Sequence, residues 1–145
     1  MTYRKGVSAE QQLIRFLKDR EYEANRTVGS RGAADIFAAK KTFLGLGRKK
    51  FAIQVKATSS DKVRISKEDI KSLMKFADTH GSIAVLAVRF SGDSWRVWDS
   101  AKDSIAPPLF SAFEASSLER LESEKTDFVE LKATDRSGQR LEKVF

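Results

Sequence analysis

The chain has 145 residues, 41% hydrophobic and 32% charged, so it is long enough to fold as one domain around a buried core. It contains no cysteine, which excludes disulfides and thiolate metal sites and is typical of a reducing compartment. No apolar run approaches the roughly 18 residues of a membrane span, and residues 1–6 lack the apolar segment of a secretion signal. We therefore expect a cytoplasmic protein with no membrane partner.

The net charge is +7, and it is distributed unevenly along the chain. Residues 1–67 carry 16 Lys and Arg against 6 Asp and Glu, whereas residues 68–145 carry 11 against 14. A basic half predicts a surface that binds polyanions such as nucleic acid. The alternative is that the charge only maintains solubility. We favour nucleic acid because the basic half also contains the candidate site carboxylates.

A first helix is predicted to begin at Ser8, which is a candidate N-cap that opens a capping box. Glu10 lies on the same face as the apolar stripe of this helix, which consists of Leu13, Ile14 and Leu17. An inward carboxylate can serve the helix dipole when it lies in the first turn. A buried carboxylate instead needs a cation or a metal ion.

Three strands are predicted next, at residues 22–28, 35–39 and 51–57. A turn at residues 29–32 and a basic loop at residues 40–50 connect them. Side chains alternate across a strand, so Gln54 and Lys56 share one face of the third strand and its apolar residues share the other. A Gln and a Lys together on a central strand have little structural purpose. With Asp35 they are therefore candidates for a functional site.

Ser66 is the predicted N-cap of a second helix, with Asp69 at its third position. The apolar stripe of that helix consists of Ile70, Leu73, Met74 and Ala77. The continuous apolar run at residues 83–88 predicts a strand covered on both faces, reached from the third strand by a parallel crossover. Residues 94–99 form a further strand.

The predicted order of elements is αβββαββ, an α/β fold with a mixed central β-sheet flanked by helices. Residues 1–106 are predicted to form the core domain and residues 107–145 a C-terminal extension that is flexible in part. Within the extension, residues 113–121 are a candidate helix and residues 128–131 a candidate strand.

Short motifs occur in a fixed order along residues 3–98: Arg4-Lys5-Gly6, Ala9-Glu10, Arg26, Gly29-Ser30, Asp35-Ile36, Val55-Lys56, Ala87-Val88-Arg89-Phe90 and Trp95-Arg96. Their order and spacing resemble those of the archaeal-type Holliday junction resolvases, a family with members in archaea and viruses. The resemblance implies the restriction-endonuclease-like fold of the PD-(D/E)xK superfamily. It also implies a homodimer that cuts four-way DNA junctions with Mg²⁺ or Mn²⁺.

The resemblance further implies roles for individual residues. Glu10 and Asp35 correspond to metal-binding carboxylates, and Lys56 corresponds to the catalytic Lys. Ser30 and Arg26 correspond to polar residues at the edge of the active site.

Gln54 takes the position at which this family usually has a metal-binding Glu. Its carbonyl oxygen can still ligate a metal ion but brings no negative charge, so metal affinity should fall. The Gln is either a natural variant or an inactivating substitution, and the sequence does not distinguish the two.

The predicted DNA contacts are Arg26, at the edge of the site, and basic residues in two groups. Arg4 and Lys5 correspond, by the resemblance, to an N-terminal segment that touches DNA. Arg31 and the loop cluster of Arg48, Lys49 and Lys50 are candidates because affinity for DNA depends mainly on phosphate contacts.

The leading functional prediction is a structure-selective, Mg²⁺-dependent endonuclease that resolves Holliday junctions in an archaeal, bacterial or virus-infected cell. A second is a related repair or restriction-type nuclease. A third, from a different class, is a non-catalytic junction-binding protein with the same fold and dimer. Gln54 favours the third, whereas Glu10, Asp35 and Lys56 argue against it. Residues 70–77 and 95–98 are candidate dimer surface, or else they only fill the monomer core.

Overall fold

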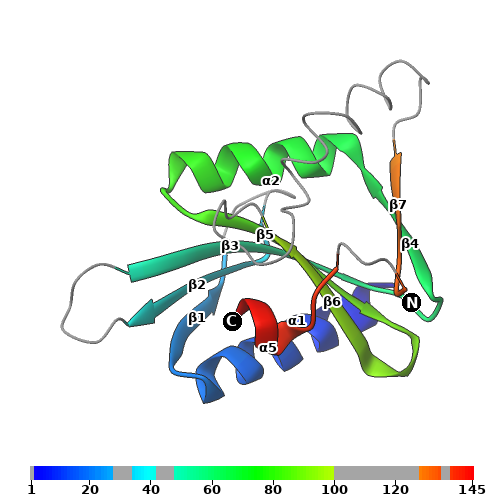
Figure 1. Ribbon diagram of the computed structural model, residues 1–145, viewed down its shortest axis with the longest axis horizontal. Coiled ribbons are helices and arrows are strands. Elements are labelled where there is room, and N and C mark those ends of the chain that lie inside the picture. Colours follow the sequence, from blue (N-terminus) through cyan, green and yellow to red (C-terminus); the bar gives the residue numbers. More distant parts are fainter. Residues whose placement is uncertain (1, 28–33, 42–47, 100–127, 135–137) are drawn as a thin grey trace.

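A five-stranded mixed sheet with helices against both of its faces forms the centre of the molecule (Figure 1). The computed structural model describes residues 2–27, 34–41, 48–99, 128–134 and 138–145. The candidate helix at residues 113–121 and the predicted turn at residues 29–32 lie outside the described residues. Within the described part of the chain, no helix is long and apolar enough to cross a membrane.

Helix α1 spans Thr2–Asp19, so the prediction that it begins at Ser8 was wrong. Ser, Thr and Asn are favourable at a helix cap but are also tolerated inside a helix. A Gly inside a helix costs only about 1 kcal/mol relative to Ala, so none of these residue types ends a helix by itself. Helix α1 therefore runs through Ser8 into its apolar face, where Ala9, Leu13 and Leu17 are completely buried. As a result Glu10 lies in mid-helix, and the helix-dipole explanation for this carboxylate no longer applies.

Strands β1 (Tyr22–Arg26), β2 (Ile36–Lys41) and β3 (Arg48–Ala57) follow α1 and pair antiparallel in that order. Helix α2 (Lys67–Thr79) then leads into β5 (Ile83–Phe90), which lies parallel to β3 as predicted. Strand β6 (Ser94–Asp99) follows the short 3-10 turn η2 (Ser91–Asp93) and closes the sheet antiparallel to β5. The strand order across the sheet is β1-β2-β3-β5-β6.

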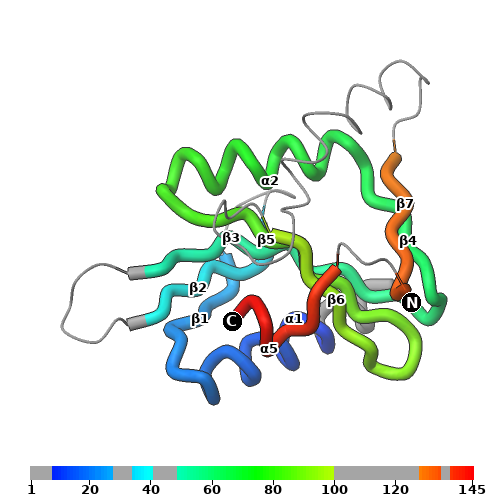
Figure 2. Tube along the Cα trace, in the orientation of Figure 1, coloured from blue at the N-terminus to red at the C-terminus, as the bar shows by residue number. Residues whose placement is uncertain are grey.

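The predicted N-cap of α2 is confirmed, because the Ser66 hydroxyl accepts a hydrogen bond from the Asp69 backbone N–H at 3.0 Å. A two-stranded antiparallel sheet lies beside the first turn of α2. It consists of β4 (Lys62–Ser66), which the sequence did not predict, and β7 (Phe128–Lys132), which it did. The two strands lie side by side in Figures 1 and 2 although they are distant in sequence.

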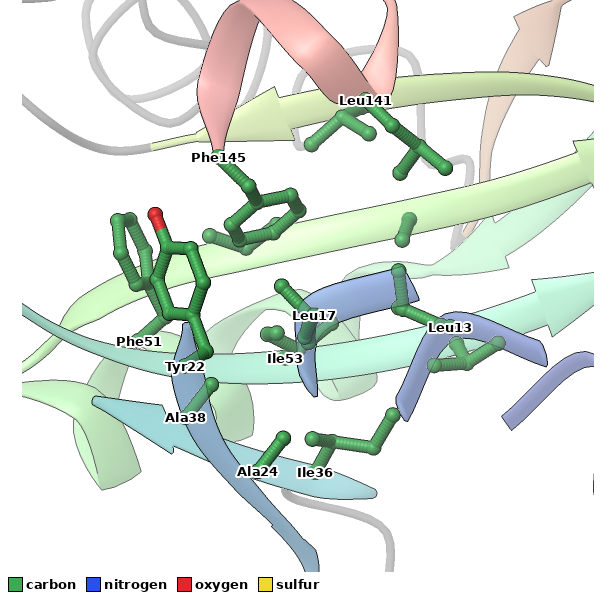
Figure 3. Packing of buried hydrophobic residues seen from close by; sticks show 14 of the residues in the cluster. Leu13, Leu17, Tyr22, Ala24, Ile36, Ala38, Phe51, Ile53, Leu141 and Phe145 are labelled. Atoms are coloured by element: carbon green, nitrogen blue, oxygen red, sulfur yellow. The ribbon is translucent and has the colours of Figure 1, made fainter. Parts of the chain in front are cut away.

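Each face of the main sheet has its own hydrophobic core. The core on the α2 face includes Ile70, Leu73, Leu86 and Trp98, together with Val129 and Leu131 of β7. The core on the α1 face includes Leu13, Leu17, Ile36 and Ile53 (Figure 3). Residues 128–134 and 138–145, from the segment predicted as an extension, thus contribute to both cores.

Helix α5 (Leu141–Val144), which was not predicted, places Phe145 against the α1-face core (Figure 3). The Phe145 ring lies edge-on to Phe51 with ring centroids 5.1 Å apart, and edge-on to Tyr22 at 5.9 Å. The Arg20 Nε donates a hydrogen bond to the Phe145 carbonyl at 3.2 Å. The last turn of the described chain is therefore anchored to the sheet by both apolar and polar contacts.

We predict that Phe145→Ala lowers the free energy of unfolding by about 3 kcal/mol, because it removes a buried aromatic ring from a packed cluster. Phe128→Ala is the matched control, since Phe128 is 52% exposed and should change stability little. Urea denaturation of both variants measures the difference. Equal losses for the two variants would contradict the packing described.

Candidate active site

Asp35 lies immediately before β2 and is held in place by main-chain hydrogen bonds. Its N–H donates to the Ile53 carbonyl at 2.8 Å, and its own carbonyl accepts from the Thr27 N–H at 3.0 Å. Ile36 pairs with Ile53, so Asp35 lies beside Gln54 on the neighbouring strand. The antiparallel register of β2 and β3 therefore brings together two polar residues that are well separated in the chain.

The carboxylate of Asp35 is fixed as firmly as its backbone. Its Oδ2 accepts a hydrogen bond from the Val55 N–H at 2.8 Å, at the residue between Gln54 and Lys56. Burial raises the pKa of Asp35 above its usual value, and the charge of Asp69 adds to this. The Val55 hydrogen bond and the charges of Lys56 and Arg26 oppose the rise. Because burial is the dominant effect, ionised Asp35 is less stable here than in water.

Glu10 reaches the same region from α1. Its Oε2 lies 3.0 Å from Nε of Arg26, the last residue of β1. Burial raises the pKa of Glu10, and the charge of Asp35 raises it further, despite the ion pair and hydrogen bond with Arg26. The effect of Asp35 on Glu10 indicates that the two carboxylates lie close enough to repel each other.

Gln54 is 3% exposed and occupies the middle of the sheet, where it pairs with Leu86 of β5. Its Oε1 atom is buried and receives no hydrogen bond from the described residues, although the residue as a whole has a polar interaction. The predicted sharing of one sheet face by Gln54 and Lys56 agrees with the burial of the alternate residues, Ile53 and Val55, in the opposite core.

Lys56 points toward the N-terminal turn of α2. Its Nζ lies 3.6 Å from Oδ2 of Asp69. The sequence marked Asp69 only as a helix-cap position and missed it as a neighbour of the site. No sequence signal identifies this contact, because it depends on how α2 lies over the end of β3.

Of the predicted DNA contacts on the basic cluster, the structure describes the side chains of two, and they lie away from this site. Lys49 and Lys50 are exposed on β3, and Lys50 is about 20 Å along the strand from Lys56 at 3.3 Å per residue. Arg4 and Lys5 belong to α1 and Arg48 begins β3, but their side chains lie outside the described residues. Ser30 and Arg31 are wholly outside them.

The chemistry of the converging side chains suits a hard divalent cation. Glu10, Asp35 and Gln54 offer oxygen donors, which Mg²⁺ and Mn²⁺ prefer. Partial burial disfavours both ionised carboxylates, and the charge of Asp35 further disfavours that of Glu10. A bound cation would relieve both effects. Among the described residues no group of three Asp, Glu, His or Cys side chains is placed to hold one ion. Two carboxylates are nevertheless enough for Mg²⁺, which usually retains several water ligands.

Comparison with known proteins gives a consistent result. The model of the family described as "Archaeal holliday junction resolvase (hjc)" matches residues 1–106. The crossover junction endodeoxyribonuclease Hjc of Methanocaldococcus jannaschii is 34% identical over 91 residues, which cover 63% of this chain and 63% of that protein. The solved structure of Archaeoglobus fulgidus Hjc, a Holliday junction resolvase, is 28% identical with a TM-score of 0.51, covering 61% of this chain and 70% of that one. The fold is therefore the one predicted.

The raised pKa of Asp35 predicts that its charge destabilises the metal-free fold. A carboxyl whose pKa is higher in the folded state contributes stability below its unfolded pKa and loses that contribution as the pH rises through the folded pKa. Asp35→Asn keeps an acceptor for the Val55 N–H but removes the charge. It should therefore unfold at higher urea concentration than the parent chain at pH 7 with EDTA.

The difference should shrink toward zero near about pH 3, where the carboxyl is protonated in both states. Asp61→Asn, at an exposed position, is the control and should show no such gain. If the parent chain is as stable as Asp35→Asn at pH 7, the ionised Asp35 does not destabilise the metal-free fold and the prediction is wrong.

Proposed function

Because the chain belongs to the archaeal Holliday junction resolvase family, we propose that it is a metal-dependent endonuclease that resolves four-way DNA junctions by paired phosphodiester hydrolysis. The observation that best supports this function is the convergence of Glu10 from the middle of α1, Asp35 from the residue before β2, and Lys56 from the end of β3. Both carboxylates are partly buried, with raised pKa values caused first by burial. A protein that only binds DNA has no use for destabilised negative charges facing its polyanionic ligand.

Glu10, Asp35 and the amide oxygen of Gln54 would hold Mg²⁺ or Mn²⁺, which supplies charge neutralisation at the phosphate and a more acidic water. The Val55 N–H keeps the Asp35 carboxylate oriented, so the site is formed before DNA binds. The Lys56 ammonium stabilises negative charge on the scissile phosphate or positions the attacking water. Arg26 neutralises Glu10 in the absence of metal. Ser30 is proposed as a further polar residue of the site from its correspondence to the family motif alone.

Gln54 supports one alternative, a junction-binding protein that has lost cleavage. A neutral amide in place of a carboxylate lowers the charge available to a cation. The retained pair of Glu10 and Asp35 favours the active enzyme, because an inactive descendant would gain stability by losing them. We therefore favour the nuclease over the junction-binding alternative. We propose that it acts in the cytoplasm.

The cleavage test uses a labelled four-way junction with Mg²⁺. The parent chain should cut it, and Asp35→Asn should reduce the rate by more than about 100-fold while folding and junction affinity are retained. Gln54→Glu should lower the Mg²⁺ concentration needed for half-maximal cleavage. Cleavage by Gln54→Glu alone would favour the junction-binding alternative for this chain. Undiminished cleavage by Asp35→Asn would rule out the site.

Junction binding should depend steeply on salt, because the basic half of the chain acts through phosphate contacts. Arg4, Lys5, Arg31 and the cluster of Arg48, Lys49 and Lys50 are the proposed contacts. Lys50→Ala should lower the slope of log affinity against log salt by about one. Lys75→Ala, exposed on α2, is the control of equal charge. A slope that is unchanged in both variants would exclude Lys50 as a phosphate contact.

We further propose that the active form is a homodimer, because resolution needs two nicks and a twofold interface supplies two sites. Much of the candidate dimer surface belongs to the monomer core, since Ile70, Leu73, Ala77 and Trp98 are buried. Phe76 and Trp95 remain partly exposed. Light scattering at micromolar concentration should give twice 16.3 kDa. A monomeric mass with and without junction would argue for a general nuclease instead.

A further inference from the structure

Asp69 faces Lys56 from a different element of the fold. Lys56 is the penultimate residue of β3, and Asp69 lies in the first turn of α2. Their charged atoms, Nζ and Oδ2, are 3.6 Å apart, with side chains 36% and 37% exposed. Ion pairs with this much exposure to solvent contribute little to stability. The pair is therefore more informative about where the ammonium is held than about what holds the fold together.

Both partners are attached to rigid backbone. The Asp69 N–H is bound by the Ser66 hydroxyl at 3.0 Å, which fixes the first turn of α2. Ile70, the next residue, is buried in the α2-face core. Lys56 pairs with Val88, which is completely buried in β5. A carboxylate on a capped helix turn can thus restrict a long Lys side chain that otherwise samples many rotamers.

The pair also lies within the electrostatic environment of the site. The charge of Lys56 lowers the pKa of Asp35, and the charge of Asp69 raises it. Lys56 is therefore an ammonium group acted on by two carboxylates, Asp35 on the sheet and Asp69 on the helix. Asp69 forms no group of three with other described Asp, Glu, His or Cys side chains that could hold one metal ion.

We propose that Asp69 is a positioning residue that holds the Lys56 ammonium at the edge of the site where the scissile phosphate binds. This proposal rests on the nuclease function proposed above. Asp69 acts through Lys56 and does not itself contact the reacting atoms. It accounts for a charged contact that neither the helix cap nor the hydrophobic core requires, because the cap uses only the Asp69 backbone N–H.

The competing explanation is that Asp69 only stabilises the positive end of the α2 dipole, as an acidic residue in the first turn does. Glu68 provides the matched control, since it is the other acidic residue of that turn and is exposed. Asp69→Asn and Glu68→Gln each remove one charge from the turn and should lower stability by similar amounts. Only Asp69→Asn should affect Lys56.

The experiment compares both variants with the parent chain in two measurements. Single-turnover junction cleavage at saturating protein should be at least about tenfold slower for Asp69→Asn, with little change in junction affinity, because misplacing a catalytic group by about 1 Å can cost up to 100-fold. Asp69→Glu should restore part of the rate. Hydrogen exchange of the Lys56 ammonium, followed by side-chain ¹⁵N NMR and assigned with Lys56→Arg, should be faster in Asp69→Asn alone.

Two results would overturn the proposal: ammonium exchange unaffected by Asp69→Asn, or faster exchange with an undiminished cleavage rate. Equal slowing of cleavage by Glu68→Gln would assign the effect to the helix dipole. If neither the parent chain nor its Gln54→Glu version cuts junctions, the proposed function fails. The exchange measurement still decides whether Asp69 holds Lys56.

Discussion

The pairing of β2 with β3 places a partly buried carboxylate where burial opposes its charge, and the candidate site depends on this arrangement. Asp35 is fixed to β3 by two hydrogen bonds, one from its N–H and one to its Oδ2. The pairing of the next residues of β2 with β3 holds its backbone as well. Glu10 approaches from α1 and experiences the negative charge of Asp35. A bound cation would offset both the burial of the Asp35 charge and its repulsion of Glu10. Metal binding should therefore stabilise the fold relative to the metal-free state.

The surrounding architecture provides the rigidity that such a site needs. Gln54 and Lys56 lie on a central strand between β2 and β5, with a hydrophobic core on each face of the sheet. The outer edge of strand β6 is covered in part, because Val97 and Gln139 form an isolated antiparallel β-bridge. Gly138 lies so close to Trp98 that an added Cβ would approach its ring to 2.8 Å. Residues 138 and 139 thus support the sheet at the edge away from β1.

The sequence predicted those features that depend on local periodicity. Alternation along residues 51–57 placed Gln54 and Lys56 on one face, and the Ser66 cap marked the start of α2. The motif order identified the family and therefore the fold. The same reasoning misplaced the start of α1, because a Ser that suits a helix cap is also tolerated inside a helix, so Ser8 alone does not fix where the helix begins.

Features that depend on distant parts of the chain were not predictable in this way. Strand β4 is stabilised by β7, whose residues come more than sixty positions later, and α5 is too short to show a helical period. The contact between Lys56 and Asp69 joins a strand to a helix cap, and neither residue carries a signal of the other. The metal-ion role of Glu10, Asp35 and Gln54 remains a prediction, resting on family membership and donor chemistry.

Anomalous diffraction from crystals soaked in Mn²⁺ tests the central claim most directly. The account predicts one strong peak within metal-ligand distance, about 2.0–2.3 Å, of a Glu10 oxygen and an Asp35 oxygen. The Gln54 oxygen should be the third protein ligand or lie next to a bound water. An anomalous peak that contacts neither Glu10 nor Asp35, or a fully soaked crystal with no peak at this position, would contradict the account.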